Sequence, residues 1–598
     1  MSQAIQEPNV AVATSSKLSA RHLSIEERKA VWEKAGLQPT LTMLSTLFAQ
    51  LDLAVSSRSR PQVEKRWAGG VPRPLRTDLL KALRKKQTIL TVSTMLQCLK
   101  EVVEFASEDG QANVLPLDFA HCVLSINEDI VATTTRVCAD GAGIDSTVVM
   151  NSIAQHSLDY PYTFETLASE AAQNWLQPWP STTGPKVVQS IGGEPRQIFE
   201  KAVGVKFLEF LTLGWTLYNM VSQEGKVQFG EGNFVVMNLG DEVIDAFKDR
   251  CVWQLPDLRE RLRLERDGSS GTPWTRYYLQ MRPFIQLASG SFLLVRPQYL
   301  VQRFMGEPLV VDVNEILKST DKAESEHFRN AVNHKFETKI GATLKRISNH
   351  LSGDGVISEY EMIKAFRIKK GSNESICDFA YVSDKLCILI DANNRHLMQG
   401  FAEGTGTLEE FDSEIRLRFS TKKFMQLNRT IEQFQKFGWK SNGLIIDDQT
   451  TFVPLVVGPE DGIPSNKMTE RLILESSRSV FEEFGNCVLP ATIVSWRDLR
   501  ILEGLVEKRG VHFAKLLLDW RNYCVSHPEF QCSVELYEQH RGYDGPLPEH
   551  EHKLGFDFFE DMRTAATDIY IERLPPDLQA NARRMVEQAK RTLPTKHL

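Results

Sequence analysis

Two apolar runs, each carrying one aspartate, follow one another within residues 375–393 and constrain the fold of this chain more than any other feature. Asp378 stands early in the first run, and Asp391 ends the second run after the apolar residues 386–390. A run this apolar is typical of a strand that is covered on both faces. A carboxylate at the end of such a strand is unfavourable unless it meets a cation or hydrogen-bond donors. The stretch therefore predicts a β-hairpin inside an α/β sheet, with two carboxylates converging at the edge of that sheet.

These carboxylates predict a metal site. The two-residue period of a strand places Asp391 and Asn393 on one face and Ala392 on the other. Two carboxylates together with the backbone carbonyl of residue 392 would form an oxygen ligand set of the kind that suits Mg²⁺. We therefore expect Mg²⁺ as the cofactor, with Asp378 and Asp391 as its ligands.

The elements around this hairpin are expected in a fixed order. We expect helices at about 322–350, 421–437 and 467–484, and strands at 355–361, 375–382, 385–392 and 451–458. Helix, three strands, helix, strand and helix is an α/β layout. In the first helix, Glu337 stands beside the apolar stripe that Phe336, Ile340, Leu344 and Ile347 form.

This arrangement resembles the PD-(D/E)xK nuclease superfamily. In that family a helix carries a Glu, the strands after it carry an Asp and a terminal (Asp/Glu)-x-Lys, and a helix and a strand follow. Glu337 resembles the helical Glu, and Asp378 resembles the first acid. The segment Ile390-Asp391-Ala392-Asn393 resembles the (Asp/Glu)-x-Lys segment.

The resemblance covers about residues 320–490 and implies a restriction-endonuclease-like α/β core. It implies a Mg²⁺-dependent nuclease in which water attacks a phosphodiester, with Glu337, Asp378, Asp391 and Asn393 at the catalytic positions. It further implies a role in bacterial defence against phage or mobile elements. The expected partner is nucleic acid, with DNA preferred to RNA.

The chain departs from the family at the motif lysine, which is Asn393 here. Asn carries no charge, and the loss of one preorganised donor typically lowers a rate by about two to three orders of magnitude. A substitute cation could come from Arg395 or from Lys422 and Lys423. The segment 391–394 also fits a plain strand end and turn, since Asp and Asn favour turns. Two functions therefore stay open: a nuclease with a relocated cation, and a non-enzymatic interaction or assembly module with a decayed core.

The rest of the chain is expected to be mostly helical. We expect a disordered N-terminus at 1–22, a mostly helical region at 23–318 with a β-hairpin near 277–303, the PD-(D/E)xK-like domain at 319–495, and a helical region at 496–598. Ser24 and Glu27 have the spacing of a capping box at the start of the first helix. Residues 261–274 are expected to form an exposed turn, and residues 543–553 a loop.

The net charge limits how the chain can bind nucleic acid. Its 70 basic and 77 acidic residues give a net charge of −7. This balance excludes a whole-surface nucleic-acid binder but allows a local basic channel. The basic residues expected to contact phosphates lie in the stretch 58–86 and beside the suspected site: Arg84, Lys85, Lys86, Lys364, Arg367, Lys369 and Lys370. A protein partner or a homo-oligomer is also consistent with the sequence.

Several other classes of protein are disfavoured. The uncharged part of the most apolar helix, residues 210–223, is shorter than the ~20 residues that a membrane span needs. The N-terminus lacks the order of charged and apolar residues that a signal peptide has. We therefore expect a cytoplasmic protein without a membrane segment. No P-loop, GxSxG, HExxH or CxxC motif occurs, which argues against the enzymes and zinc sites that those motifs mark.

Overall fold

The computed structural model describes residues 11–592 apart from 19, 57–58, 135–145, 161, 163, 238, 269–271, 369–374, 464–466, 528–531 and 543–544. Lys369 and Lys370, and residues 1–10 of the predicted disordered N-terminus, lie outside the described residues. The described residues form many helices and sheets of four, five and two strands. The mixed α/β class that we expected is therefore confirmed.

The five-stranded sheet has the order β11-β10-β7-β6-β5. Its strands are β5 (Gly355–Ser358), β6 (Phe379–Ser383), β7 (Leu386–Ala392), β10 (Thr451–Gly458) and β11 (Thr492–Ser495). Strands β5, β6 and β7 form an antiparallel meander, and β10 runs parallel to both β7 and β11. Because β7 and β10 are parallel, the segments that follow them leave the sheet at the same end.

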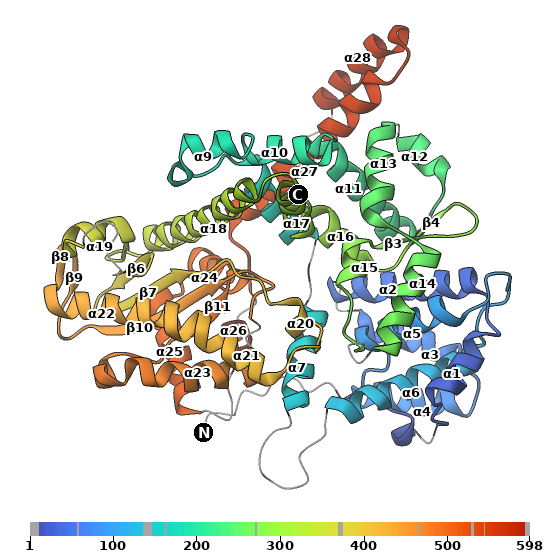
Figure 1. Ribbon diagram of the computed structural model, residues 1–598, viewed down its shortest axis with the longest axis horizontal. Helices are drawn as coiled ribbons and strands as arrows, with labels where there is room; N and C mark the ends of the chain where they lie inside the picture. The colour runs from blue at the N-terminus through green and yellow to red at the C-terminus, as the bar shows by residue number, and fades with distance from the viewer. Residues whose placement is uncertain are drawn as a thin grey trace.

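Helices cover both faces of this sheet (Figure 1). One face packs against α18 (Lys322–His350), α24 (Trp496–Arg509), α25 (Phe513–Ser526) and α26 (Val534–His540). The other face packs against α7 (Ser146–Asp159), α19 (Glu359–Phe366), α21 (Leu408–Ile415), α22 (Met425–Phe437) and α23 (Lys467–Phe481). Successive residues of β7 alternate between the two cores, with Leu389 in the α22 core and Ile390 in the α18 core. Burial on both faces explains why the strands are so apolar.

The elements of this region match the predicted order closely. The first helix and the strand at 451–458 have the predicted bounds. The predicted strand 355–361 instead stops at Ser358, because a capping box between Ser358 and Glu361 starts α19 there. The predicted helix 421–437 belongs to a longer helical run, in which a π-helical stretch, η4 (Arg416–Phe424), joins α21 to α22. Strand β11 was not predicted.

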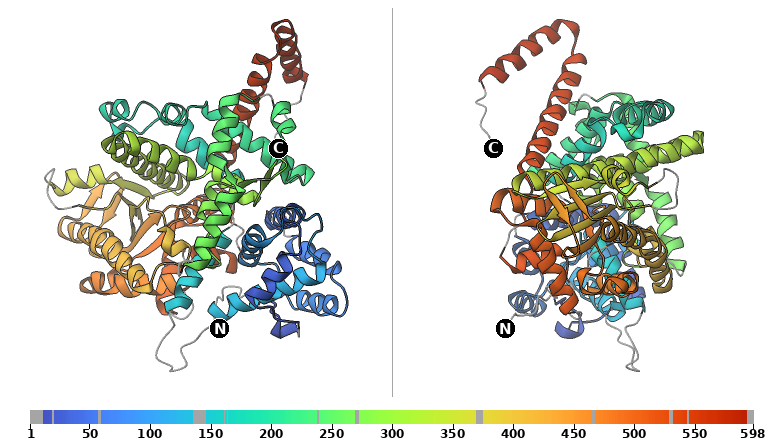
Figure 2. Two further views of the ribbon diagram at one scale, coloured as in Figure 1. Left: turned by 45° about the vertical axis from the view of Figure 1, so that its right-hand side comes forward. Right: turned by 90° about the vertical axis from the view of Figure 1, so that its left-hand side faces the viewer.

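The N-terminal half is built mainly of helices, and its first six helices lie together (Figure 2) and share one apolar core with the later helices of this half. These six are α1 (Ile25–Trp32), α2 (Leu37–Ser56), α3 (Arg60–Gly69), α4 (Leu75–Arg84), α5 (Val92–Phe105) and α6 (Pro116–Thr134). After α7 come α8 (Phe164–Ala171), α9 (Pro185–Ser190), α10 (Pro195–Val203), α11 (Phe207–Glu224), α12 (Glu231–Met237), α13 (Asp241–Cys251), α14 (Leu255–Asp267), α15 (Tyr277–Met281), α16 (Pro297–Met305) and α17 (Pro308–Thr320).

A small four-stranded sheet of order β1-β4-β3-β2 lies within this half. Its strands are β1 (Gln228–Phe229), β2 (Val252–Gln254), β3 (Phe284–Gln286) and β4 (Phe292–Leu294). Strands β3 and β4 form the β-hairpin predicted near 277–303. The exposed turn predicted at 261–274 is wrong at both ends, because α14 continues to Asp267 and Trp274 is fully buried.

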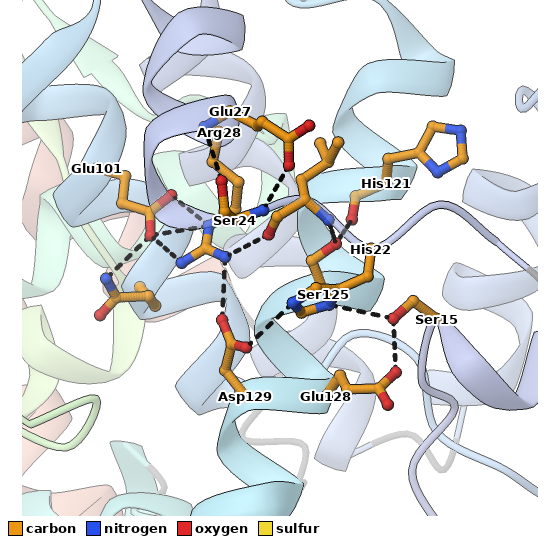
Figure 3. Close-up of polar contacts among 12 residues, drawn as sticks. Ser15, His22, Ser24, Glu27, Arg28, Glu101, His121, Ser125, Glu128 and Asp129 are labelled. Atoms are coloured by element: carbon orange, nitrogen blue, oxygen red, sulfur yellow. Dashed lines mark hydrogen bonds and ion pairs between the residues drawn. The ribbon is translucent and has the colours of Figure 1, made fainter.

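The prediction of disorder at 1–22 is also wrong for the described residues 11–22. The backbone N–H of Ala13 donates to the carbonyl of Thr88 at 2.9 Å. The Ser15 hydroxyl donates to the Glu128 carboxylate at 2.5 Å, as Figure 3 shows. The polar composition of this segment therefore gave no sign of its order, because residues distant in the sequence, such as Glu128, hold it in place.

The first helices are joined by a buried ionic network (Figure 3). The Arg28 guanidinium lies 3.1 Å from Glu101 and 2.9 Å from Asp129. Ser24 and Glu27 form the predicted capping box, which starts α1 and so places Arg28. These ion pairs and the surrounding apolar core account for the packing of the N-terminal helices.

The C-terminal helices α27 (Glu549–Glu572) and α28 (Pro576–Thr592) follow the α/β region. The loop predicted at 543–553 is shorter than expected, because α27 already begins at Glu549. Phe558 and Met562 of α27 join the apolar core of the N-terminal half, whereas α28 projects from the body (Figure 1). That same core includes Phe328 and Ala331 of α18, so packing is continuous across residue 318. No helix in the described part of the chain has the length and apolar run needed to cross a bilayer.

The two remaining strands, β8 (Trp439–Ser441) and β9 (Leu444–Ile446), form an antiparallel hairpin beside the end of α22. The short helix α20 (Gln399–Ala402) follows β7 after a loop.

Candidate active site

An open cleft of about 770 Å³ lies where β7 ends and β6 begins. Its walls come from α17, α18, the loop 393–396 and η4. Glu337, Asp378 and Lys423 line the cleft together with Ala392 and Asn393. The cleft therefore contains most of the residues that the sequence predicts to carry chemistry.

Three carboxylates meet in this cleft from three different elements. Glu337 comes from α18, Glu359 from the first position of α19, and Asp378 from the residue before β6. One carboxylate oxygen from each lies within 4.8 Å of the other two. Two of these three residues, Glu337 and Asp378, were predicted from the sequence.

Helix α18 comes close enough to deliver Glu337 because of a glycine one turn further along the helix. A Cβ atom at Gly341 would lie 2.6 Å from the ring of Phe379, the first residue of β6. A side chain at position 341 would force the Phe379 ring to move, so glycine permits this close approach of helix and strand. The close packing brings Glu337 to the start of β6, where Asp378 stands.

Asp378 connects the elements that meet at this edge of the sheet. Its carboxylate accepts a hydrogen bond of 2.6 Å from the backbone N–H of Ala392 at the end of β7. Its backbone carbonyl accepts a hydrogen bond of 2.7 Å from the N–H of Glu359. The capping box of α19 fixes the backbone of Glu359 from the other side. The three elements are therefore held in register by hydrogen bonds, and their side chains are preorganised.

Asp391 lies deeper and is held by a lysine. Its side chain is fully buried and contacts the Lys423 ammonium, which also donates to the Ala392 carbonyl at 3.2 Å. Lys423 comes from η4, on the same side of the sheet as Asp391. The second carboxylate oxygen of Asp391, Oδ2, is buried and accepts no hydrogen bond from any described residue. Asp391 therefore retains an unsatisfied acceptor at the base of the cluster.

The four carboxyl groups at this end of the sheet outnumber the single cation that the described residues place beside them, Lys423. Burial raises the pKa of Glu337 to about 7, and the nearby Asp378 and Glu359 carboxylates add to the rise. Burial likewise raises the pKa of Glu359 and of Asp378. Burial alone would lower the pKa of Lys423, but the Asp391 carboxylate outweighs it and raises that pKa. Lys423 is therefore permanently charged, while the carboxyl groups compete for protons or for a further cation.

The donor set fits a hard divalent cation such as Mg²⁺. All four acids offer carboxylate oxygens, which are the ligands that Mg²⁺ prefers. The structure groups Asp378 with Glu337 and Glu359, whose oxygens converge. Asp391, the other ligand predicted from the sequence, pairs with Lys423 instead and keeps one oxygen, Oδ2, without a hydrogen bond from any described residue.

The other predicted catalytic residues lie near the cluster without joining it. The Asn393 backbone N–H donates to the Val457 carbonyl at 2.9 Å, which continues the pairing with β10 past the end of β7. Of the three substitute cations, Arg395 pairs with Glu414 at 2.6 Å, and Lys422 is exposed. Lys423 is the one that reaches Asp391.

The predicted nucleic-acid contacts fall into two groups. Lys364 and Arg367 are exposed on α19 and at its C-terminal end, on the element that carries Glu359. Arg84, Lys85 and Lys86 are exposed at the end of α4, among the first helices of the N-terminal half. The first group is therefore connected to the cleft through one short helix, whereas the second belongs to a different part of the molecule.

Glu359 is the site residue that the sequence analysis missed. We expected it inside a strand, where its side chain would have had no special position. The signal that could have found it is Ser358-Glu359-Tyr360-Glu361, which has the S-x-x-E spacing of a capping box. A helix start at Ser358 places Glu359 at the edge of the sheet.

Comparisons with protein-family models, with curated proteins and with solved structures found no significant match to this chain. The function must therefore be argued from the geometry of the site.

Proposed function

We propose that this chain hydrolyses phosphodiester bonds of nucleic acid with the help of Mg²⁺, and that residues 319–495 are a PD-(D/E)xK-like core in which Lys423 replaces the motif lysine. The observation that carries the proposal is the contact of the Lys423 ammonium with Asp391 and with the Ala392 carbonyl. In the sequence motif a lysine would stand at position 393, directly beyond these atoms. A lysine from η4 thus brings the missing charge to the end of β7.

The order of strands supports this proposal. An antiparallel meander of β5, β6 and β7 is followed by the parallel strand β10, with α18 before the meander and α22 after it. This is the sequence of elements that the resemblance implies. Asp391 is the penultimate residue of β7, as the resemblance implies, whereas Asp378 stands one residue before β6 rather than within the strand.

Each residue has a distinct part in the proposed reaction. Glu337, Glu359, Asp378 and Asp391 would hold the cation through carboxylate oxygens. Bound there, Mg²⁺ would supply Lewis-acid chemistry to a phosphate oxygen and its nucleophile. Lys423 cannot act as a base because it stays protonated, so it would contribute positive charge and a hydrogen-bond donor to the transition state. The ion pair with the buried Asp391 carboxylate would hold the Lys423 ammonium in one place.

The substrate would approach along α19, where Lys364 and Arg367 are exposed. Such basic residues would contact phosphates, and phosphate contacts do not distinguish one base sequence from another. The proposed substrate is DNA in preference to RNA, and the resemblance places such an enzyme in bacterial defence against phage or mobile elements.

Cleavage assays test the proposal. Purified full-length protein is incubated with plasmid, linear DNA and RNA in Mg²⁺ or Mn²⁺, beside an Asp378→Asn variant. The matched control is Asp354→Asn, because Asp354 accepts hydrogen bonds of 2.6 Å from Tyr381 and Ser383 at the opposite end of the same strands. We expect cleavage by the wild type and by the control, and none by Asp378→Asn. Equal cleavage by all three proteins would contradict the proposal.

The basic residues are tested by retention of DNA and RNA in low salt. Replacing Lys364 and Arg367 by Ala should weaken retention, because each lost phosphate contact lowers the salt-dependent part of the affinity. The triple replacement of Arg84, Lys85 and Lys86 by Ala probes the N-terminal stretch. Unchanged retention in either variant would remove that group from the binding surface.

A second candidate function is a non-enzymatic module that binds nucleic acid or protein. The observation that favours it is the same ion pair, because Lys423 and Asp391 neutralise one another and so stabilise the end of the sheet without chemistry. This candidate predicts no cleavage with either metal, and binding that Asp378→Asn does not change. Repeating the assay with neighbouring gene products distinguishes a decayed core from an enzyme that needs a partner.

A further inference from the structure

A second group of side chains that could bind a metal ion lies beside the same cleft, outside the carboxylate cluster described above. It consists of Glu307, His396 and Asp461, whose ligand atoms all lie within 4.8 Å of one another. Glu307 precedes α17, His396 follows β7, and Asp461 follows β10. The parallel arrangement of β7 and β10 brings the last two together, and α17 supplies the third from the N-terminal half.

The three side chains converge on one atom. His396 Nδ1 lies 3.0 Å from the Glu307 carboxylate and also contacts the Asp461 carboxylate. The backbone N–H of Leu397 donates to the Asp461 carbonyl at 3.0 Å, which fixes the two loops against each other. Ligand atoms that lie this close together can bind one ion after only small side-chain movements, because bonds of about 2.1 Å in a tetrahedral site place them about 3.4 Å apart.

The charge in this group is not balanced by its neighbours. Two carboxylates face one imidazole, and even a protonated imidazole would leave a net negative charge. Of the other nearby cations, Lys339 pairs with Glu170 at 3.8 Å, Arg500 pairs with Glu460 at 2.8 Å, and Arg276 donates to the backbone carbonyls of Trp274 and Ala402. Among the described residues, His396 is the one base that forms an ion pair with Glu307 or Asp461. Burial, partly offset by His396, raises the pKa of Glu307 to about 8.

An ion could reach this group from two sides. Glu307 and His396 line the open cleft of about 770 Å³ and also a second pocket of about 140 Å³, which Asp461 lines as well. Asn174, Tyr277 and Asn394 contribute polar groups to this second pocket. Both spaces can supply water molecules to complete a coordination shell.

We propose that Glu307, His396 and Asp461 bind a divalent transition-metal ion of the Zn²⁺ class, separate from the Mg²⁺ cluster. An imidazole nitrogen together with carboxylates selects such ions, whereas a set of oxygens alone suits Mg²⁺. On binding, the ion takes the place of the proton on His396 Nδ1, and that proton passes to solvent. One His and two carboxylates leave at least one coordination position for water.

This ion would join the N-terminal half to the loops that leave β7 and β10. The loop after β7 also carries Asn393 and Asn394 into the cleft wall, so the ion would fix this wall beside the carboxylate cluster. The binding of this ion does not depend on the proposed nuclease activity.

Zinc titration of the full-length protein tests the inference. Protein stripped with a chelator is titrated with Zn²⁺ in excess Mg²⁺, and bound zinc is counted by elemental analysis after dialysis. We expect one Zn²⁺ per chain in the wild type and a loss of affinity above about 100-fold in His396→Gln, more than the loss of an outer-shell partner causes. Asp378→Asn, which alters the other cluster, and His22→Gln, which alters a distant histidine, should bind Zn²⁺ as the wild type does.

Two results would overturn the inference: a wild type that retains no Zn²⁺, and a His396→Gln variant that binds it unchanged. Circular dichroism of each variant shows whether it is folded. If His396→Gln does not fold, Glu307→Gln provides the second test, since Glu307 lies at the surface of the cleft and its loss should also weaken Zn²⁺ binding. Co²⁺ added to the chelator-stripped wild type should give visible absorption bands that Zn²⁺ then removes, and the absence of these bands counts against the site.

Discussion

The cleft contains two carboxylate clusters, and they differ in the base that each one holds. In the first, Glu337, Glu359 and Asp378 converge beside the Asp391–Lys423 pair. In the second, Glu307 and Asp461 converge on His396. Both lie at the end of the sheet where β7 leaves it, so topology alone does not distinguish them.

The difference lies in what each base can do after a metal ion arrives. Lys423 stays protonated and cannot become a ligand, so it remains a fixed positive charge beside any ion that the carboxylates hold. His396 can lose its Nδ1 proton and become a ligand itself. One cluster is therefore suited to a hard cation and a charged reaction centre, and the other to a bound transition-metal ion.

The largest expected effect comes from removing the fixed charge. Lys423→Gln leaves Asp391 as a buried carboxylate without a cation, and breaking a buried pair in this way costs about 3 kcal/mol of unfolding free energy. Cleavage by the folded protein should fall by about two to three orders of magnitude, as expected for the loss of one preorganised donor. Urea unfolding and cleavage kinetics measure the two effects.

The neighbouring exposed residue provides the control, since Lys422→Gln removes a lysine from the same turn without touching Asp391. A rescue sharpens the test further. Adding Asn393→Lys to Lys423→Gln returns a lysine to the position that the motif gives it, and part of the activity should return. A Lys423→Gln protein that cleaves at the wild-type rate would mean that the two clusters do not differ in the way described.

Much of the first cluster could be predicted from local sequence. Asp391 ends an apolar run, and Asp378 begins another, so a strand pattern alone brings both to the edge of a sheet. Glu337 stands beside the buried stripe of a helix that is apolar on one side. Lys423 was one of three candidate cations, and sequence could not choose among them because the π-helical stretch that aims it at Asp391 has no reliable sequence signal.

The second cluster could not be predicted in the same way. Glu307, His396 and Asp461 come from three segments far apart in the sequence, and none stands in a motif. Their meeting depends on how the N-terminal half packs against the ends of β7 and β10. The same reason explains the error at residues 11–22, which are ordered by contacts with residues such as Glu128 that are distant in the sequence.

The second prediction concerns His396 in metal-free protein. Burial alone would lower the pKa of His396, but Asp461 and Glu307 outweigh it and raise the pKa to about 10. The charged imidazole therefore stabilises the fold fully below its ordinary pKa of about 6.5, and this stabilisation is lost as pH rises towards 10. Because the side chain is partly exposed, we expect His396→Gln to lower the unfolding free energy by only about 1 to 2 kcal/mol at pH 6.

Urea unfolding in chelator between pH 6 and pH 10 measures this effect, and the difference between the two proteins should shrink as pH rises. A difference that stays constant over this range would show that His396 does not form the charged contact described.

The third prediction concerns Glu337, whose effect on stability changes over a lower pH range than that of His396. Its carboxyl group has a pKa raised to about 7, mainly by burial, so the folded protein keeps a proton that the unfolded chain releases. The stabilisation that Glu337 contributes should therefore be lost as pH rises from about 4.5 to 7, so the stability of Glu337→Gln relative to the wild type should increase over this range. The side chain is half buried and water screens it, so we expect the variant to gain only ~1 kcal/mol at pH 7 in metal-free protein.

The measurement is the same urea unfolding, here between pH 4.5 and pH 7.5. Excess Mg²⁺ should reverse the order of the two proteins, because the wild type binds the ion more tightly than the variant does. If the variant gains the same stability at every pH, the carboxylate cluster is not the source of the effect.

The smallest expected effect tests how the first cluster is positioned. Ser358 accepts from the Glu361 backbone N–H and so starts α19 at Glu359. Ser358→Ala removes this cap, which should cost about 1 kcal/mol of stability and let Glu359 move away from the other carboxylates. Ser24→Ala is the matched control, because it removes the same kind of capping box from α1, at a helix start that supplies no residue to the cleft. Both variants should lose similar stability, but only Ser358→Ala should weaken Mn²⁺ binding, measured by electron paramagnetic resonance. Equal Mn²⁺ affinity in the two variants would mean that Glu359 is not a ligand, and that the first cluster depends on Glu337, Asp378 and Asp391 alone.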